Sequence, residues 1–175
     1  NLKQIEDRFV GAGLAKRDEL MNYKFSKDEP LILSDKPESA SLEGYLFPDT
    51  YRFFKDATLS DVISKMIDNL SNKLTPDLET AIKNSSYNTY EILTMASLIE
   101  KEIPKDSDRS VVAGILWKRL KAGVPLQVDA TLVYITGRNE LYEADKKINS
   151  RYNTYLYRGM PKGPIANPGL SAIKA

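Results

Sequence analysis

The segment that follows Thr58 has the clear pattern of an amphipathic helix. Thr58 and Asp61 have the spacing of a capping box in which Asp replaces Glu, and such a box marks a helix N-terminus. The apolar residues behind it fall on one stripe at helical spacing: Leu59, Val62, Ile63, Met66, Ile67 and Leu70. Further helices are expected from Thr75-Pro76, over about 90–102, between Asp108 and Gly123, and near 131–135. This much helical pattern constrains the chain to a mostly helical fold.

Residues 42–54 depart from the helical pattern. Aromatic residues crowd this segment, and they alternate as Tyr45, Phe47 and then Tyr51, Phe53. Alternation of this kind, interrupted by a Pro-Asp step, predicts two short strands or a hairpin. We therefore expect an α+β fold, namely a mostly helical domain with a small antiparallel sheet.

The chain divides by composition into a short flank and a longer main part. Residues 2–21 predict two short helices, and residues 26–41 are polar with two prolines, as in a linker or an exposed crossing. We expect residues 1–41 to form an N-terminal helical flank and linker, and residues 42–175 to form the main domain. Residues 42–74 are a candidate strand–helix subdomain within it.

The 175-residue chain contains no His and no Cys. This excludes nucleophilic sites built on His, thiolate chemistry and the common zinc sites, so carboxylates are the main candidates for proton chemistry. Lys and Arg total 25 against 24 Asp and Glu, and no polybasic stripe is present, which argues against a nucleic-acid partner. No apolar run approaches the roughly 18 residues of a membrane span.

Two carboxylates lie near the end of the helix expected over 90–102. At about 100° per residue, Ile92 and Ala96 mark the buried direction, and Glu100 and Glu102 fall at the two edges of that apolar arc. A carboxylate edged by aliphatic side chains loses solvation and is a candidate general acid. Periodicity does not choose between the two residues, and ordinary glutamates at the rim of a helix are the simpler interpretation of both.

A polar block, Tyr152-Asn153-Thr154-Tyr155, precedes a loop dense in Gly and Pro over residues 159–169. Aromatic faces pack on the C–H groups of sugars, and amides bind hydroxyl and acetamido groups. The block is therefore a candidate carbohydrate site. A stiff loop whose tyrosines cover the core is the alternative interpretation.

Gln127 and Asp129 form a third polar pair, on a turn that follows Pro125. Asp129 serves equally well as the N-cap of the next helix. Asn167 closes the Gly/Pro loop, where Asn167-Pro168 can cap and open a helix. These residues are candidates for local structure as well as for a ligand.

Several blocks of the sequence occur together and in a fixed order. They are LEGYLFPDTY at 42–51, LTMASLIEKE at 93–102, VAGI at 112–115, RL at 119–120, PLQ at 125–127 with Asp129, YNTY at 152–155 and GPIANPGL at 163–170. The series resembles the MltG-type (YceG-like) endolytic murein transglycosylases over residues 42–174. Residues 1–41 are compatible with the N-terminal flank of that family.

The resemblance implies an enzyme that cleaves the glycan strand of peptidoglycan between N-acetylmuramic acid and N-acetylglucosamine. The product would carry a 1,6-anhydro-muramyl end, and no water would be consumed. The family's catalytic acid and base is the first Glu of the Ala-Ser-x-x-Glu-Lys-Glu block, which is Glu100 in this sequence. One carboxylate suffices for this reaction, and it calls for no cofactor and no metal.

The resemblance also implies the surroundings of the site. The expected substrate-binding residues are Gln127, Asp129, Tyr152, Asn153, Thr154, Tyr155 and Asn167. The expected partners are peptidoglycan glycan strands and, as candidates, cell-wall synthases, with no nucleic acid. The expected location is the extracytoplasmic face of the bacterial cell membrane, reached through an N-terminal single-pass anchor that this chain does not contain.

Two other functions stay open at this point. A muramidase would hydrolyse the same bond, and it usually needs a second carboxylate. A non-catalytic peptidoglycan-binding or divisome scaffold module would bind the strand without cutting it. The mass of the released products separates these cases, because an anhydro product is lighter by one water than a hydrolysed one.

Overall fold

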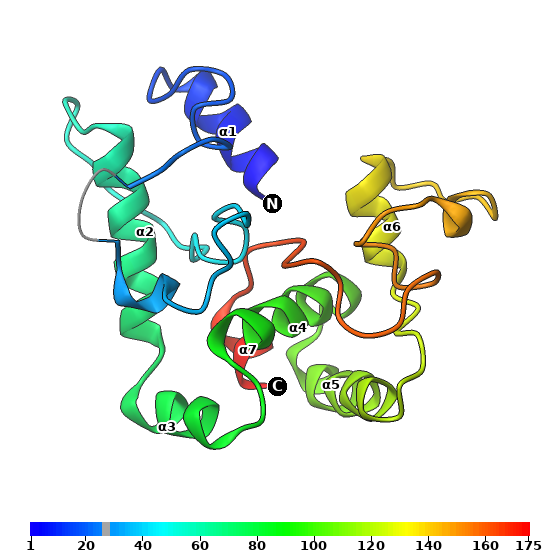
Figure 1. Ribbon diagram of the computed structural model, residues 1–175. Coiled ribbons are helices and arrows are strands. Elements are labelled where there is room, and N and C mark those ends of the chain that lie inside the picture. The colour runs from blue at the N-terminus through cyan, green and yellow to red at the C-terminus, as the bar shows by residue number, and fades with distance from the viewer. Residues whose placement is uncertain (26–28) are drawn as a thin grey trace.

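Helices form the regular structure of the chain (Figure 1). The computed structural model describes residues 1–25 and 29–175. Its helices are α1 (Leu2–Gly11), η1 (Leu31–Leu33, 3-10), α2 (Leu59–Lys73), α3 (Pro76–Asn84), α4 (Thr89–Glu102), α5 (Asp106–Lys121), α6 (Asp129–Thr136), η2 (Asp145–Lys147, 3-10) and α7 (Leu170–Lys174). The linker predicted over 26–41 falls in part on residues 26–28, which lie outside the described residues.

Helix α4 occupies the centre of the molecule and packs against α5, α6 and α7 (Figure 1). Its N-terminus has a capping box: the Asn88 side chain accepts from the N–H of Glu91, and the Glu91 carboxylate accepts from the N–H of Asn88. Residues 93–99 are all buried. The helix predicted over 90–102 is confirmed, and its first and last turns are the parts that reach the surface.

Helix α2 confirms the stripe and the cap predicted for it. Thr58 Oγ1 accepts from the N–H of Asp61, and the Asp61 carboxylate accepts from the N–H of Thr58. All the apolar residues of the stripe are buried: Leu59, Val62, Ile63, Met66, Ile67 and Leu70. Local signals sufficed here because both the cap and the stripe lie within one short segment.

The antiparallel sheet predicted over residues 42–54 is wrong, because the described residues contain no strand. The N–H groups of Gly44 and Leu46 both donate to Oδ1 of Asn167, at 2.8 and 2.9 Å, so they are not free for a ladder. Tyr45 and Leu46 are neighbours in sequence and both are 0% exposed, so the segment has no single buried face. The fold is helical, not α+β.

Gly44 allows this irregular segment to approach the Gly/Pro loop. Its φ of +93° is a conformation that side chains rarely adopt, and a Cβ at this position would lie 2.6 Å from Cγ of Pro164. A glycine is therefore required where the two segments meet. Their contact places the residues after Gly44 beside the loop that carries Asn167.

The second helix predicted within residues 2–21 is also wrong, since turns follow α1 up to residue 22. Within these turns Asp18 has a φ of +65°, which a helix does not allow. The buried carboxylate of Glu6 organises these turns, because Oε1 accepts from the N–H groups of Leu20 and Met21 at 3.2 Å each. Backbone donors that a helix would pair internally are satisfied by a side chain from α1.

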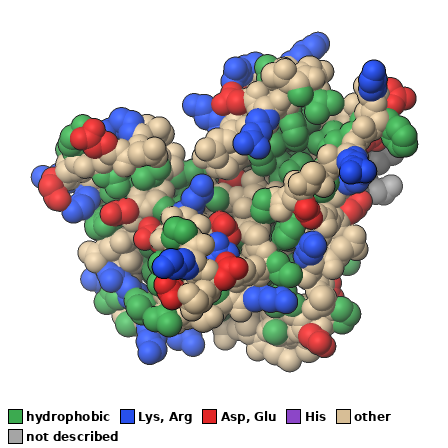
Figure 2. All heavy atoms as spheres, turned by 180° about the vertical axis from the view of Figure 1, so that it is seen from behind, with side chains coloured by type: hydrophobic (Ala, Val, Ile, Leu, Met, Phe, Trp, Pro, Cys, Tyr) green, Lys and Arg blue, Asp and Glu red, His purple; other side chains and the backbone are tan. Residues whose placement is uncertain are grey.

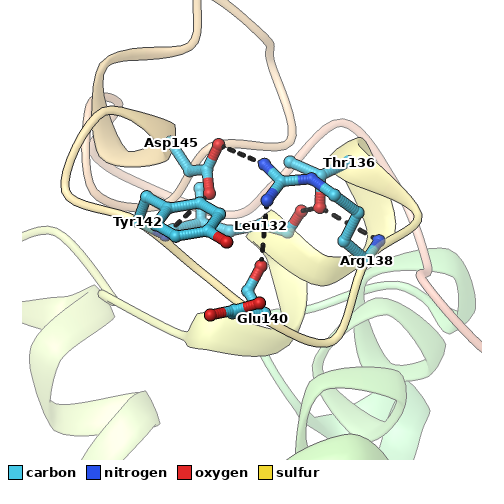
Figure 3. Close-up of polar contacts among 6 residues, drawn as sticks. All are labelled: Leu132, Thr136, Arg138, Glu140, Tyr142 and Asp145. Carbon is cyan, nitrogen blue, oxygen red and sulfur yellow. Dashed lines mark hydrogen bonds and ion pairs between the residues drawn. The ribbon is translucent and has the colours of Figure 1, made fainter.

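An ion pair shapes the segment that follows α6 (Figure 3). Arg138 donates to Oδ1 of Asp145 at 2.8 Å, and Oδ2 of Asp145 accepts from the N–H of Tyr142 at 2.8 Å. A second nitrogen of Arg138 reaches the Glu140 carbonyl at 3.1 Å. The Asp145 side chain is 8% exposed, so this pair anchors the segment against the end of α6.

Charged side chains of both signs are spread over the face seen in Figure 2, rather than gathered in a patch of one sign. Within the described part of the chain, no helix is both long enough and apolar enough to cross a bilayer.

Candidate active site

Glu100 lies in the last turn of α4, where the helix reaches the surface. Its side chain is 28% exposed. Oε1 accepts a hydrogen bond from Nη2 of Arg109 at 3.2 Å, and Oε2 accepts from the N–H of Gly169 at 3.1 Å. Each oxygen has one protein partner, and a carboxylate oxygen can accept two. Glu100 is therefore fixed in place while it remains able to bond a ligand.

Glu100 lines a groove of about 730 Å³. The groove lies between α1, the segment after Leu46, the start of α2 and the end of α4. Its walls are largely apolar and aromatic, and its polar residues include Arg8, Asp49, Glu100, Lys101 and Asn167. Asp49 is already bonded, since its carboxylate accepts from the Asn69 amide and from the N–H of Thr50.

Arg109 connects Glu100 to helix α5. It is 7% exposed, and its guanidinium contacts three groups: Glu100, Asp106 and the carbonyl of Ile103. A buried guanidinium needs such partners because its charge is costly to desolvate. Arg109 thereby joins the end of α4 to the first turn of α5.

Asn167 lines the same groove, but its amide is occupied within the protein. Oδ1 accepts from the N–H groups of Gly44 and Leu46, and Nδ2 donates to Oε1 of Glu43 at 3.0 Å. Asn167 thus fixes the loop whose next residues lead to Gly169. Asn167 therefore fixes the wall of the groove relative to the N–H of Gly169, which donates to Glu100.

Glu43 is a carboxylate of 3% exposure directly behind that wall. Burial raises its pKa above the ordinary value, and hydrogen bonding to the N–H of Leu2 acts in the opposite direction. Both oxygens of Glu43 face that N–H, at 3.0 and 2.8 Å. Glu43 therefore joins the start of α1 to Asn167.

The two carboxylates that periodicity left open lie in different places. Glu102 lines a second hollow of about 430 Å³, together with Asp129 and Tyr134, whereas Glu100 does not. Oε1 of Glu102 accepts from the N–H of Ala130 at 3.3 Å, near the start of α6. Lys101, which lies between the two glutamates in sequence, lines both hollows and separates one from the other.

Asn153 and Thr154 are enclosed in the protein, at 0% and 1% exposure. The Asn153 amide donates to the carbonyls of Lys146 and Ile148, and its oxygen accepts from the N–H of Tyr155. Thr154 Oγ1 accepts from the N–H of Val128 at 2.9 Å. These side chains hold the YNTY block against the start of α6.

The two tyrosines of that block have polar or aromatic partners. The ring of Tyr152 lies 5.0 Å from that of Tyr134, and burial, with a contribution from Glu43, raises the pKa of Tyr152. Tyr155 donates its hydroxyl to Oδ1 of Asp129. Burial and then Asp129 raise the pKa of Tyr155 to about 12, so the phenol stays protonated at neutral pH.

Gln127 is exposed and has a φ of +57°. Its side-chain oxygen accepts from Nη2 of Arg119, and its N–H donates to the carbonyl of Thr154 at 3.0 Å. The structure therefore brings Gln127, Asp129, Thr154 and Tyr155 together around the start of α6. It places Glu100 and Asn167 in the groove on the other side of Lys101.

Sequence reasoning missed Arg109 and Glu43. Arg109 lies nine residues after Glu100, across a turn that no periodicity argument bridges, and Glu43 is distinguished in the sequence only as part of the block at 42–51. The sequence does place Arg109 beside Asp106 and Asp108, in the first turns of the helix that follows the candidate acid. That neighbourhood was the one clue to its role. No group of three or more metal-ligating side chains occurs in the described residues.

Comparison with known proteins gives a consistent family. A family model described as the YceG-like family matches residues 1–175. A Bacillus subtilis protein named endolytic murein transglycosylase is 42% identical over 138 residues, covering 77% of this chain and 38% of that protein. A Streptococcus pneumoniae protein with the same name is 34% identical over 182 residues, covering 99% of this chain and 32% of that protein.

A solved structure agrees with these relatives. A crystal structure of a yceG-like protein from Listeria monocytogenes matches 98% of this chain and 53% of that chain, with a TM-score of 0.71 and 27% identity. The chain spans about a third of the length of the curated relatives that it matches. From its sequence and its fold, the chain belongs to the YceG-like family.

Proposed function

We propose that this chain is the catalytic part of a peptidoglycan lytic transglycosylase and that Glu100 is its acid and base. The observation that carries the proposal is the fixed but partly open carboxylate of Glu100 in a groove of about 730 Å³. The other groove carboxylate, Asp49, is exposed, and hydrogen bonds from Asn69 and Thr50 lower its pKa, which makes it a poorer proton donor than Glu100. The relatives' printed name supports the same activity.

The reaction needs one carboxylate because the two proton transfers follow one another. Protonated Glu100 gives its proton to the oxygen of the leaving N-acetylglucosamine as the bond from muramyl C1 to that oxygen breaks. The C6 hydroxyl of the same muramyl unit attacks C1, and the Glu100 carboxylate takes its proton. The bonds and protons balance without water, and Glu100 ends as it began.

The attacking hydroxyl and C1 belong to one sugar, so the attack benefits from tethered reactants. The groove must hold that sugar in a bent conformation beside Glu100. Its aromatic wall, which includes Tyr51 and Phe53 with ring centroids 6.0 Å apart, suits the C–H faces of a sugar.

We assign two kinds of role to the binding residues expected from the sequence. Asp129, Tyr155 and Gln127 lie together at the start of α6, where Asp129 lines the second hollow. Their proposed role is to contact the glycan strand on that side of Lys101. Asn153, Thr154 and Asn167 act by fixing the loops, since their side chains are bonded within the protein. Tyr152 supports the ring of Tyr134.

The substrate sets the place of action. A peptidoglycan strand lies outside the cytoplasmic membrane, so the site works on the extracytoplasmic face of that membrane. We propose that the whole protein is held there by a single-pass N-terminal anchor and works beside cell-wall synthases. The relatives' name, which specifies murein, supports the substrate.

The test compares Glu100→Gln with Glu102→Gln on purified peptidoglycan strands. Glutamine keeps the shape of the side chain but cannot exchange the proton, so E100Q should lose cleavage by at least about 100-fold while its circular dichroism is unchanged. E102Q, which changes the neighbouring carboxylate in the same helical turn, should retain most of its activity. Wild-type activity in E100Q sinks the assignment.

The products of the wild-type chain decide between the remaining functions. A lytic enzyme releases fragments that end in anhydro-muramic acid, lighter by one water than the fragments that a muramidase releases. Hydrolysed ends would replace this proposal by a muramidase. Binding to sacculi with no released fragment would replace it by a scaffold module.

A further inference from the structure

Arg109 ties the carboxylate of Glu100 to helix α5. Its Nη2 donates to Oε1 of Glu100 at 3.2 Å, its Nη1 lies 3.1 Å from Oδ1 of Asp106, and its Nε donates to the carbonyl of Ile103 at 3.2 Å. The residue is 7% exposed. All three nitrogens of the guanidinium are therefore engaged, and the group cannot turn toward solvent while these contacts hold.

We propose that Arg109 is a positioning residue for the cleavage reaction, which holds the Glu100 carboxylate toward the groove. This inference rests on the function proposed above. It concerns a residue that touches no part of the substrate and acts through Glu100 alone.

The positioning of Glu100 by Arg109 follows from geometry. Oε1 is held from α5 by Arg109, and Oε2 is held from the Gly/Pro loop by the N–H of Gly169 at 3.1 Å. Two donors on separate elements fix both the place and the plane of the carboxylate. A displacement of about 1 Å at a reacting group can reduce a rate by about 100-fold, so this restraint matters for catalysis.

Arg109→Gln and Arg109→Lys test this role. In R109Q, kcat should fall by about tenfold or more while KM stays close to the wild-type value, because Arg109 holds the reacting carboxylate and does not bind the strand. R109K keeps the charge but not the three-way fork. Its kcat should lie between that of R109Q and that of the wild type, again with little change in KM.

Asp106→Asn is the complementary variant. The Asp106 side chain is 73% exposed, so this change does not threaten the fold. Asparagine removes the charged partner of Nη1 and leaves the bond from Nη2 to Glu100 in place. The guanidinium should be held less firmly, so kcat should fall by a few fold, less than in R109Q, with KM unchanged.

A loss in kcat with an unchanged KM and an unchanged circular dichroism spectrum is the signature that a merely structural role would not produce. If R109Q is folded and keeps the wild-type kcat, the proposal is overturned. If R109Q does not fold, R109K and D106N decide: a wild-type kcat in both overturns the proposal as well. Loss of cleavage in E100Q together with an unaffected R109Q would leave the proposed function standing and remove only the role of Arg109.

Discussion

The amide of Asn153 uses its hydrogen-bonding groups inside the protein. Its nitrogen donates to the carbonyls of Lys146 and Ile148, and its oxygen accepts from the N–H groups of Tyr155 and Leu156. With 0% exposure, it has no surface to offer a sugar. Its contribution to function passes through the position of the loop.

Asn153→Ala should therefore act mainly on stability. It leaves several buried backbone groups without partners, and we expect the free energy of unfolding to fall by about 3 kcal/mol. Chemical denaturation measures the loss. Asn84→Ala, at the exposed end of α3, is the matched control and should change stability by less than about 0.5 kcal/mol. Equal stabilities of the two variants would contradict the role given to Asn153.

Gly169 offers a test of the contact that holds Oε2 of Glu100. Its φ of −79° suits proline, but Gly169→Pro removes the N–H that donates to Glu100 and puts ring carbon in its place. We expect kcat to fall by about tenfold or more.

Gly169→Ala is the control for that variant. The added Cβ would lie 3.6 Å from Oε2, an ordinary contact, and the N–H is kept. G169A should therefore cleave strands at close to the wild-type rate. Equal kcat values for G169P and G169A would show that this hydrogen bond does not serve the reaction.

At the scale of elements, α4 is the support of the site, since its buried middle turns fix the direction of its last turn. Its N-terminal cap is remote from Glu100, at the opposite end of the helix. A substitution at the cap can therefore change the stability of the protein without changing the chemistry at Glu100.

Asn88→Ala should lower the free energy of unfolding by about 1 kcal/mol, because the N–H of Glu91 loses its acceptor. Asn88→Ser should keep most of the stability, since a serine hydroxyl can accept the same bond. Thermal unfolding gives the difference, and cleavage well below the melting temperature should be equal in both. A large loss of cleavage in folded N88A would mean that the start of α4 influences the site directly.

How far the sequence could predict these elements depends on where their partners lie. The box and the stripe of α2 are local and were predicted, as was α4. The sheet over 42–54 was not a correct prediction, because the N–H of Leu46 is bonded to a side chain 121 residues away. Asn167 provides that acceptor, and nothing near Leu46 in the sequence announces it.

Prediction of the site from the sequence also depends on whether the partners are local or distant. Periodicity placed Glu100 and Glu102 at the edges of an apolar arc and could not choose between them, since both lie in one helical turn. What separates them is the tertiary surroundings: Arg109 and Gly169 face Glu100, and Ala130 faces Glu102. Those partners come from α5, the Gly/Pro loop and α6.

At the scale of the whole molecule, buried and half-buried tyrosines link folding to alkaline pH. Burial raises the pKa of Tyr90 to about 12, and burial followed by Asp129 does the same for Tyr155. Burial raises the pKa values of Tyr45 and Tyr134 further. These folded-state values lie above the value of about 10 in an unfolded chain, so the stability from neutral phenols is complete below pH 10 and is lost as the pH rises toward the folded values.

An alkaline titration followed by phenolate absorbance should therefore show a late phase above pH 10. That phase should come from the tyrosines whose pKa values are raised, and it should coincide with loss of helical circular dichroism. A single phase near pH 10 with intact helices would contradict the burial of these side chains.

The central claim is that Glu100 cleaves the glycan strand without water, and cleavage in ¹⁸O-labelled water tests it most directly. The wild-type chain should release anhydro-muramyl ends that contain no label, and E100Q should release none. Labelled, hydrolysed ends from the wild type, or undiminished cleavage by E100Q, would contradict the account.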